Sequence, residues 1–191
     1  MKLNTPNRLT LARIILTPIF LLMFTNPNIK NHYLLALSIY VIASLTDFLD
    51  GYIARKRGII TNFGKFTDPL ADKMLTTSAF IGLMHMGYCN LWVLFLILFR
   101  EFGVSSIRLV ASSQGVVIPA NMWGKVKTAF MMVSTPVLML LISLKEDFGI
   151  LSASFPLYTV AGILLWTCAI LTVISGVTYI SEGAKVIDFS K

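Results

Sequence analysis

The sequence predicts an all-α integral membrane protein with about six transmembrane helices, organised as a single transmembrane catalytic domain over residues 1–191. Two observations carry this prediction. Hydrophobic residues make up 56% of the 191 positions and charged residues 13%, whereas soluble domains contain about 45–50% and about 25%. Apolar stretches approaching the length of a bilayer-spanning helix, about 20 residues, also recur along the chain. These stretches cover residues 9–24, 33–54, 66–86, 91–111, 126–144 and 155–180.

Within the first stretch, the apolar run over residues 14–24 follows Lys2, Arg8 and Arg13, as the apolar part of a secretory signal would follow basic residues. No small-residue cleavage site comes after it and further apolar stretches do, so we expect it to be the first spanning helix. Each later stretch is bounded by Asn, Pro, Gly, Ser or charged residues. The connections are too short to hold a soluble domain, and the sequence shows no internal repeat.

The basic residues predict the orientation of these helices, because cytoplasmic loops of membrane proteins hold an excess of Lys and Arg. With a cytoplasmic N-terminus, the opposite side of the membrane keeps only Lys30 and Lys145. Both termini are then cytoplasmic. These flanks account for the net charge of +7, so we expect membrane lipids and no nucleic acid as partners. The cytoplasmic side collects Lys2, Arg8, Arg13, Arg55, Lys56, Arg57, Lys65, Arg108, Lys125, Lys127, Lys185 and Lys191.

Four of the nine acidic residues lie at adjacent ends of the second and third stretches. Asp47 and Asp50 are three residues apart, and Asp68 and Asp72 are four apart, so each pair shares one helical face. The second helix runs toward the cytoplasm and the third runs away from it, which places all four at a similar depth. An ionisable residue in a spanning segment costs about 2.5–3.5 kcal/mol on insertion scales and therefore indicates a functional site.

Four carboxylates at close range would raise one another's pKa unless a cation neutralises them. Oxygen ligands without His or Cys favour Mg²⁺, Mn²⁺ or Ca²⁺, and two such ions would suit a displacement at phosphorus. One alternative is a structural role in which the carboxylates pair with Arg55, Lys56, Lys65 or Lys73. Another is a cation transporter or channel, although transporter sites tend to lie near the bilayer midplane rather than close to one surface.

The acids belong to a longer pattern with small residues beside them, which leave the backbone accessible to a flat or phosphorylated ligand. The pattern is Asp47-x-x-Asp50-Gly51-x-x-Ala54-Arg55, eight residues, then Gly64-x-x-x-Asp68-x-x-x-Asp72. It resembles the complete signature of the CDP-alcohol phosphatidyltransferase family. Three further segments are similar to the bacterial branch of that family that makes phosphatidylglycerophosphate. They are Pro6-Asn7-x-Leu9-Thr10-x-x-Arg13, Arg100-Glu101 and Gly124-Lys125-x-Lys127-Thr128.

The resemblance implies a six-helix membrane fold, a homodimer, and a location in the plasma membrane of a bacterium with the active site facing the cytoplasm. It also implies an enzyme that transfers the phosphatidyl group of CDP-diacylglycerol to glycerol 3-phosphate and releases CMP. The alternative within the family is a synthase that uses another acceptor, such as serine or inositol phosphate.

Carried over position by position, the resemblance makes Asp47, Asp50 and Asp68 ligands of Mg²⁺ or Mn²⁺, with two ions per site. Asp72 would lie near the ions as well and act as the general base toward the acceptor hydroxyl. We expect direct transfer because no Ser, Cys or His is placed as a covalent nucleophile. The residues implied to bind the donor nucleotide and diphosphate are Asp50, Gly51, Ala54, Arg55, Gly64 and Lys65.

The phosphate of the acceptor requires cations, and the fourth and fifth stretches supply them. Arg100 and Arg108 lie two turns apart on roughly one helical face, and Lys125 and Lys127 enter the fifth stretch from the cytoplasmic side. These four residues are the predicted acceptor-phosphate site, which Thr10 and Arg13 could also face. For Arg100 the alternative is an ion pair with Glu101, and for the lysines it is a positive flank of the membrane.

Overall fold

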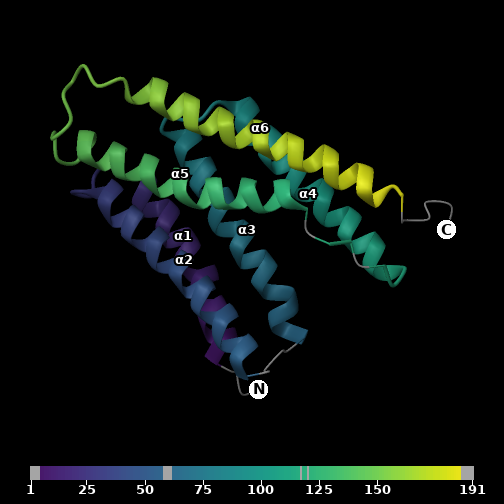
Figure 1. Cartoon of the computed structure of the whole chain (residues 1–191). Helices are drawn as coiled ribbons and strands as arrows, with labels where there is room; N and C mark the ends of the chain where they lie inside the picture. The colour runs from purple at the N-terminus through teal and green to yellow at the C-terminus, as the bar shows by residue number, and fades with distance from the viewer. Residues whose placement is uncertain (1–4, 58–61, 117, 120, 186–191) are drawn as a thin grey trace. The chain divides into compact units, whose positions relative to one another are not determined.

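The computed structural model describes residues 5–57, 62–116, 118–119 and 121–185, with side chains for all of these except 5–6, 48–57, 62–63 and 65–66. The described residues form six α-helices and no strand, which confirms the predicted fold class (Figure 1). The helices are α1 (Thr5–Thr25), α2 (His32–Arg57), α3 (Asn62–His85), α4 (Leu91–Ser113), α5 (Met122–Glu146) and α6 (Leu157–Gly183).

Several helices extend beyond the apolar stretches that predicted them. α1 begins at Thr5 rather than at residue 9, and α3 begins at Asn62 rather than at residue 66. In both cases polar residues ahead of the apolar run continue the helix. Propagating a helix requires one further backbone hydrogen bond per residue and no apolar side chain, so hydropathy alone underestimates helix length.

Three helices of the described chain are long and apolar enough to cross a membrane: Asn7–Thr25 within α1, α5 and α6. A shorter apolar segment, His32–Asp47, begins α2. Charged residues interrupt the apolar sequence in the last part of α2, in α3 and in α4. Most residues of the two predicted sites lie in these less apolar segments, whereas Lys125 and Lys127 lie on α5.

The packing of the chain divides it into two compact units. The first unit comprises residues 1–86 and 136–157, and the second comprises residues 87–135 and 158–191. The boundary inside α5 falls at Pro136, a proline within that helix. The single transmembrane domain expected from the sequence stays a prediction.

In the first unit, α1 packs along both α2 and α3 (Figure 1). Buried aromatic rings join α1 to α2, with ring centroids 5.8 Å apart for Phe20 and Tyr40 and 5.4 Å apart for Phe24 and Tyr33. On the α3 side, Gly82 lets Phe24 approach closely, since a Cβ at residue 82 would lie 2.6 Å from Phe24 Cδ1. This packing fixes α1 between the two helices that carry the acidic residues.

The second unit contains α4, the first part of α5 and α6. Val104, Ala111, Ile118 and Tyr179 form a buried apolar cluster in it. α4 begins after Asn90, whose side chain accepts a hydrogen bond of 2.8 Å from the backbone N–H of Trp92, as an N-cap residue does.

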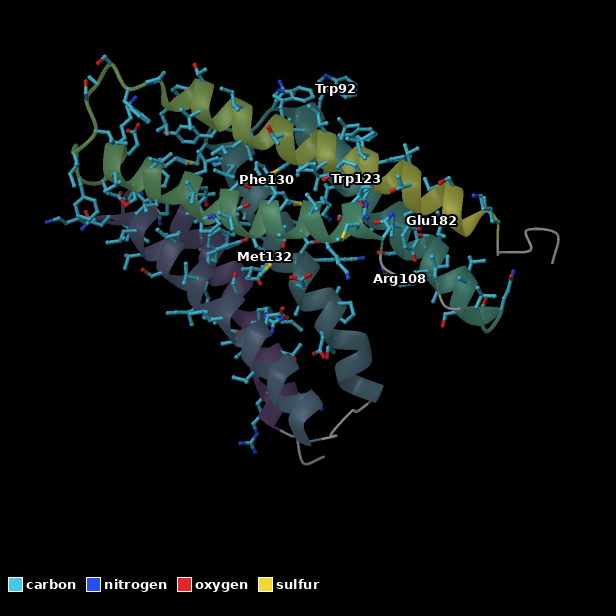
Figure 2. The ribbon with its side chains drawn as sticks, viewed as in Figure 1. Trp92, Arg108, Trp123, Phe130, Met132 and Glu182 are labelled. Carbon is cyan, nitrogen blue, oxygen red and sulfur yellow. The ribbon has the colours of Figure 1, made fainter. Side chains whose placement is uncertain are left out.

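Large apolar side chains remain exposed on many helices. Leu22, Phe99 and Val177 are each more than 60% exposed, as are the labelled side chain of Trp92 and many others (Figure 2). Soluble proteins rarely expose so much apolar surface. In a chain with several apolar helices of spanning length, such a surface fits contact with lipid.

Candidate active site

One acidic residue of α2 and one of α3 are held by polar side chains of α1. Arg13 forms an ion pair with Asp47 Oδ1, and Thr10 Oγ1 donates a hydrogen bond of 2.7 Å to Asp68 Oδ1. Thr10 and Arg13 are fully buried and three residues apart, so they lie on one face of α1. One face of α1 therefore binds one carboxylate from each of the two acidic helices.

This arrangement changes the position expected for Thr10 and Arg13. The sequence analysis considered them as contributors to the acceptor-phosphate site, whereas the structure places both against the acids. Sequence patterning could not show this because the contacts join residues 34 and 58 positions apart. The signal that points to them is a cation and a hydroxyl within an apolar spanning helix, which need a buried partner.

The side chains of Asp47 and Asp68 are accessible as well as held. The Asp47 side chain is 39% exposed, and Asp68 is half-buried. Asp72 lies one turn after Asp68 on α3 and is exposed. The carboxylates that the structure describes are therefore open to a ligand while their helices are fixed by α1.

The side chain of Asp50 lies outside the described residues. Among the side chains that the structure does describe, no three or more acids, histidines or cysteines lie close enough together to hold a metal ion. The four-carboxylate metal site therefore stays a prediction. The described donors are oxygens of carboxylates, which is the ligand type that Mg²⁺ and Mn²⁺ prefer, so their chemistry fits such an ion.

The residues expected to bind the donor nucleotide lie on the last turns of α2 and the first turn of α3. Gly51, Ala54 and Arg55 belong to α2, and the backbone of Lys65 belongs to α3. The side chains of Arg55 and Lys65 lie outside the described residues. Gly64 is buried in α3. The helical placement agrees with the motif, and the binding roles stay predictions.

In the second unit, two of the predicted acceptor-site cations meet at one carboxylate. Arg100 Nη1 lies 3.1 Å from Glu101 Oε1, and Lys127 Nζ of α5 forms an ion pair with the same oxygen. Arg100 Nη2 also donates a hydrogen bond of 2.7 Å to Ser175 Oγ of α6. The ion pair with Glu101 considered for Arg100 is thus present, and Lys127 is a buried partner of it rather than a residue of the exposed flank.

Arg108 and Lys125 are placed differently from this pair. Arg108, labelled in Figure 2, donates a hydrogen bond of 3.4 Å from Nε to the hydroxyl of Tyr179, and its guanidinium lies 5.7 Å from the centre of the Tyr179 ring. Such a cation–π contact helps to hold an arginine without neutralising its charge. Lys125 is exposed near the start of α5. Arg100 and Lys127 thus share the Glu101 carboxylate, whereas Arg108 of α4 is held separately by Tyr179 of α6.

Several polar residues of this region were missed by the sequence analysis. Ser175 and Tyr179 of α6 contact the two arginines, and Asn121 donates a 2.7 Å hydrogen bond to Thr178 while it accepts one of 2.8 Å from the backbone N–H of Gly124. The sequence signal for them was weak: single hydroxyls in an apolar helix are common at helix contacts. Contact with an arginine distinguishes only Ser175 and Tyr179 from such hydroxyls.

The first unit also has a hollow of about 440 Å³ at the ends of α1 and α2 away from Thr10 and Asp47. In its wall, Asp147 Oδ2 accepts hydrogen bonds of 2.8 Å from the backbone N–H of Leu34 and 2.9 Å from Ser143 Oγ. Asp147 therefore ties the end of α5 to the start of α2, which is a structural role. The hollow is lined by Pro27, Ile29, Lys30, Asn31, His32, Tyr33, Glu146 and Asp147.

Comparison with known proteins identifies the family. The family model for CDP-alcohol phosphatidyltransferase matches residues 3–174, which include all six helices except the end of α6. The chain belongs to the CDP-alcohol phosphatidyltransferase family. It is therefore a transferase of phospholipid biosynthesis and a membrane protein, as the motif indicated.

Relatives of this CDP-alcohol phosphatidyltransferase match it over nearly its whole length. A protein of Bacillus subtilis named CDP-diacylglycerol–glycerol-3-phosphate 3-phosphatidyltransferase is 38% identical over 98% of both chains. A Rickettsia felis protein of the same name is 41% identical over 95% of this chain and 96% of its own. A probable phosphatidylglycerophosphate synthase of Mycobacterium tuberculosis is 38% identical over 95% of this chain and 82% of its own.

Proposed function

We propose that this CDP-alcohol phosphatidyltransferase moves the phosphatidyl group of CDP-diacylglycerol to glycerol 3-phosphate, giving phosphatidylglycerophosphate and CMP. The observation that carries the proposal is the likeness to enzymes with this activity in their names over 98% or 96% of their length. The hydrogen-bonded placement of Asp47 and Asp68 against α1 supports it, because it presents acids of the signature on fixed helices.

In this proposal Asp47, Asp50, Asp68 and Asp72 hold two Mg²⁺ or Mn²⁺ ions. When bound, these ions would neutralise charge on the donor diphosphate and stabilise the leaving CMP. Arg13 keeps Asp47 in position and Thr10 keeps Asp68 in position, so the carboxylates need little reorganisation. The side chain of Asp47 is partly exposed and Asp68 is half-buried, so a ligand can reach either carboxylate.

Asp72 is the proposed general base. A carboxylate within about 2.6–3.2 Å of a hydroxyl can take its proton as the oxygen attacks phosphorus. The bond from the acceptor oxygen to the phosphatidyl phosphorus forms while the bond from that phosphorus to CMP breaks, and the proton passes to Asp72. The exposure of Asp72 on the turn after Asp68 supports this role, because a base must reach the substrate.

Binding of the two substrates is assigned to the two sets of residues named above. Gly51, Ala54 and Gly64 would border the donor nucleotide, and Arg55 and Lys65 would bind its phosphates together with Asp50. Arg100, Arg108, Lys125 and Lys127 would bind the phosphate of glycerol 3-phosphate. Guanidinium and ammonium groups suit a phosphate because they form charge-assisted hydrogen bonds with its oxygens.

The remaining parts of the proposal concern the setting of the enzyme. It would work as a homodimer in the plasma membrane of a bacterium, with both termini and the active site in the cytoplasm. The distribution of Lys and Arg supports this orientation.

The decisive experiment is an assay of CMP release by the purified protein in detergent with CDP-diacylglycerol and Mg²⁺ or Mn²⁺. Glycerol 3-phosphate, serine and inositol phosphate are offered in parallel, and the lipid product is identified by mass. We expect release only with glycerol 3-phosphate. Release with serine or inositol phosphate instead would replace the acceptor, and divalent-ion flux into sealed vesicles without CMP release would favour a transporter.

A further inference from the structure

The Glu101 carboxylate forms ion pairs with two cations, which belong to two different helices of the second unit. Its Oε1 binds Arg100 Nη1 of α4 at 3.1 Å and Lys127 Nζ of α5. The side chains of Arg100 and Lys127 are 12% and 7% exposed, and that of Glu101 is 23% exposed. Water therefore screens this cluster poorly, so its charge interactions are stronger than those of surface pairs.

α6 is shaped to receive the Arg100 side chain. Ser175 Oγ accepts a 2.7 Å hydrogen bond from Arg100 Nη2. A Cβ at the next residue, Gly176, would lie 2.9 Å from Arg100 Cγ, so the glycine makes room for the arginine stem. Arg100 is thus fixed at three points, by Glu101, by Ser175 and by the gap at Gly176.

Arg108 brings a third cation to the same unit, and an uncharged side chain holds it. Its contacts with the hydroxyl and the ring of Tyr179 leave its charge intact. Arg100 Nε is also buried and has no hydrogen-bond acceptor among the described residues. A buried N–H without an acceptor costs about 1–3 kcal/mol, so the other contacts of the Arg100 side chain must offset this cost.

We infer that Glu101 is a positioning residue that holds Lys127 and Arg100 in the geometry in which they bind the phosphate of the acceptor. This inference rests on the proposed function, because it takes glycerol 3-phosphate as the acceptor. Glu101 carries the same charge as the phosphate and does not bind it. It acts through Lys127 and Arg100, and Ser175 supports Arg100 from α6.

A positioning role and a purely electrostatic one predict opposite results for Glu101→Gln. If Glu101 only lowered the positive potential, its neutralisation would favour a phosphate dianion and lower the KM for glycerol 3-phosphate. If it positions the cations, its neutralisation removes one ion pair each from Lys127 and Arg100, holds them less firmly and raises that KM. We expect a rise of about tenfold, the effect of one lost charge-assisted hydrogen bond, with the KM for CDP-diacylglycerol within about twofold of the original.

The matched control is Glu182→Gln, which makes the same chemical change at an exposed glutamate of α6 in the same unit. We expect both KM values to stay unchanged in it. Glu101→Asp keeps the charge and should recover part of the lost affinity for glycerol 3-phosphate. The double variant Glu101→Gln with Lys127→Met tests whether Glu101 acts through Lys127. If it does, Glu101→Gln should change the KM for glycerol 3-phosphate little further once the Lys127 ammonium is gone.

Ser175→Ala provides a second variant should Glu101→Gln fail to fold, since it removes only the hydroxyl partner of Arg100. It should raise the KM for glycerol 3-phosphate by about threefold to tenfold and leave that for CDP-diacylglycerol unchanged. An unchanged or lowered KM for glycerol 3-phosphate in Glu101→Gln, or in Ser175→Ala where only that variant folds, overturns the inference while the proposed function stands. Absence of CMP release by the original protein with glycerol 3-phosphate overturns the proposed function itself, and this inference with it.

Discussion

At the scale of single residues, Arg13 is the most deeply buried of the charged side chains that the structure describes. It is fully buried on α1, and its partner Asp47 has a side chain that is 39% exposed. A buried cation is stable only when an anion compensates it. Asp47 therefore has two roles: its carboxylate pairs with Arg13, and its exposed part can bind a ligand.

Replacement of Arg13 by Met should destabilise the first unit by about 1–3 kcal/mol. The cost is smaller than that of breaking a fully buried pair because the freed Asp47 carboxylate can hydrate. Chemical denaturation in detergent measures the change. Arg8→Met is the control, since Arg8 lies on the same helix and is exposed. Equal stability of the two variants would contradict a buried ion pair between α1 and α2.

Asp72 and Asp47 should respond differently to replacement by Asn. Asp72→Asn should lower kcat by about 10²–10⁴, as removal of a general base does, while Mn²⁺ binding stays largely intact through Asp47, Asp50 and Asp68. Asp47→Asn should weaken Mn²⁺ binding itself, which electron paramagnetic resonance of free Mn²⁺ measures without any turnover. Normal turnover of Asp72→Asn would remove it from the role of base, and unchanged Mn²⁺ affinity in Asp47→Asn would show that it is not a ligand.

The sequence was informative about the acids and less so about their partners. The fixed spacing of Asp47, Asp50, Asp68 and Asp72 marks the site because neighbours on one helix face are set by helix geometry alone. The contacts of Thr10 and Arg13 with those acids depend on how α1 packs against α2 and α3. No local pattern encodes that packing, and the same holds for Ser175 beside Arg100.

At the scale of helices, hydropathy predicted the number of elements and misjudged where several begin. α3 is the clearest case, since it starts four residues before the apolar stretch and carries two acids in its first half. Polar residues can continue a helix whose backbone hydrogen bonds are already propagating. Helix existence was therefore predictable from the apolar run, whereas the start depended on residues that the run excludes.

The contact between α1 and α3 should be sensitive to one added methyl group. Gly82→Ala places a Cβ 2.6 Å from Phe24 Cδ1, and Phe24 is buried and stacked on Phe20, so its ring cannot move aside freely. We expect a loss of about 1–3 kcal/mol in unfolding free energy, the usual cost of overpacking. Gly103→Ala on α4 is the control, because no atom lies within 4 Å of a Cβ there. A Gly82→Ala variant as stable as Gly103→Ala would show that the helices are less tightly packed.

At the scale of the whole molecule, the orientation of the chain in the membrane can be mapped with thiol reagents. Both native cysteines are free and buried, so they should react slowly and leave the signal to cysteines introduced at exposed positions. Cys89 lies between α3 and α4, and burial raises the pKa of its thiol to about 12. A thiol reacts with maleimide or iodoacetamide as the thiolate, so Cys89 should react slowly near pH 7.5 and faster as the pH approaches 12. Because the folded pKa is the higher one, the fold loses stability from this group as the pH rises above about 9, the value in the unfolded chain.

The orientation itself can then be tested with cysteines introduced at two exposed lysines. Lys30→Cys lies in the connection between α1 and α2, and Lys185→Cys lies just after α6. Six crossings with a cytoplasmic N-terminus put these positions on opposite sides of the membrane. In intact cells a membrane-impermeant maleimide should label Lys30→Cys and should label Lys185→Cys only after the cells are opened. The positive-inside distribution of Lys and Arg is the physical reason. Labelling of both variants in intact cells would mean that the chain crosses the membrane an even number of times between them, rather than the five expected. Labelling of Lys185→Cys alone would invert the proposed orientation and move the acids of α2 and α3 to the outer surface.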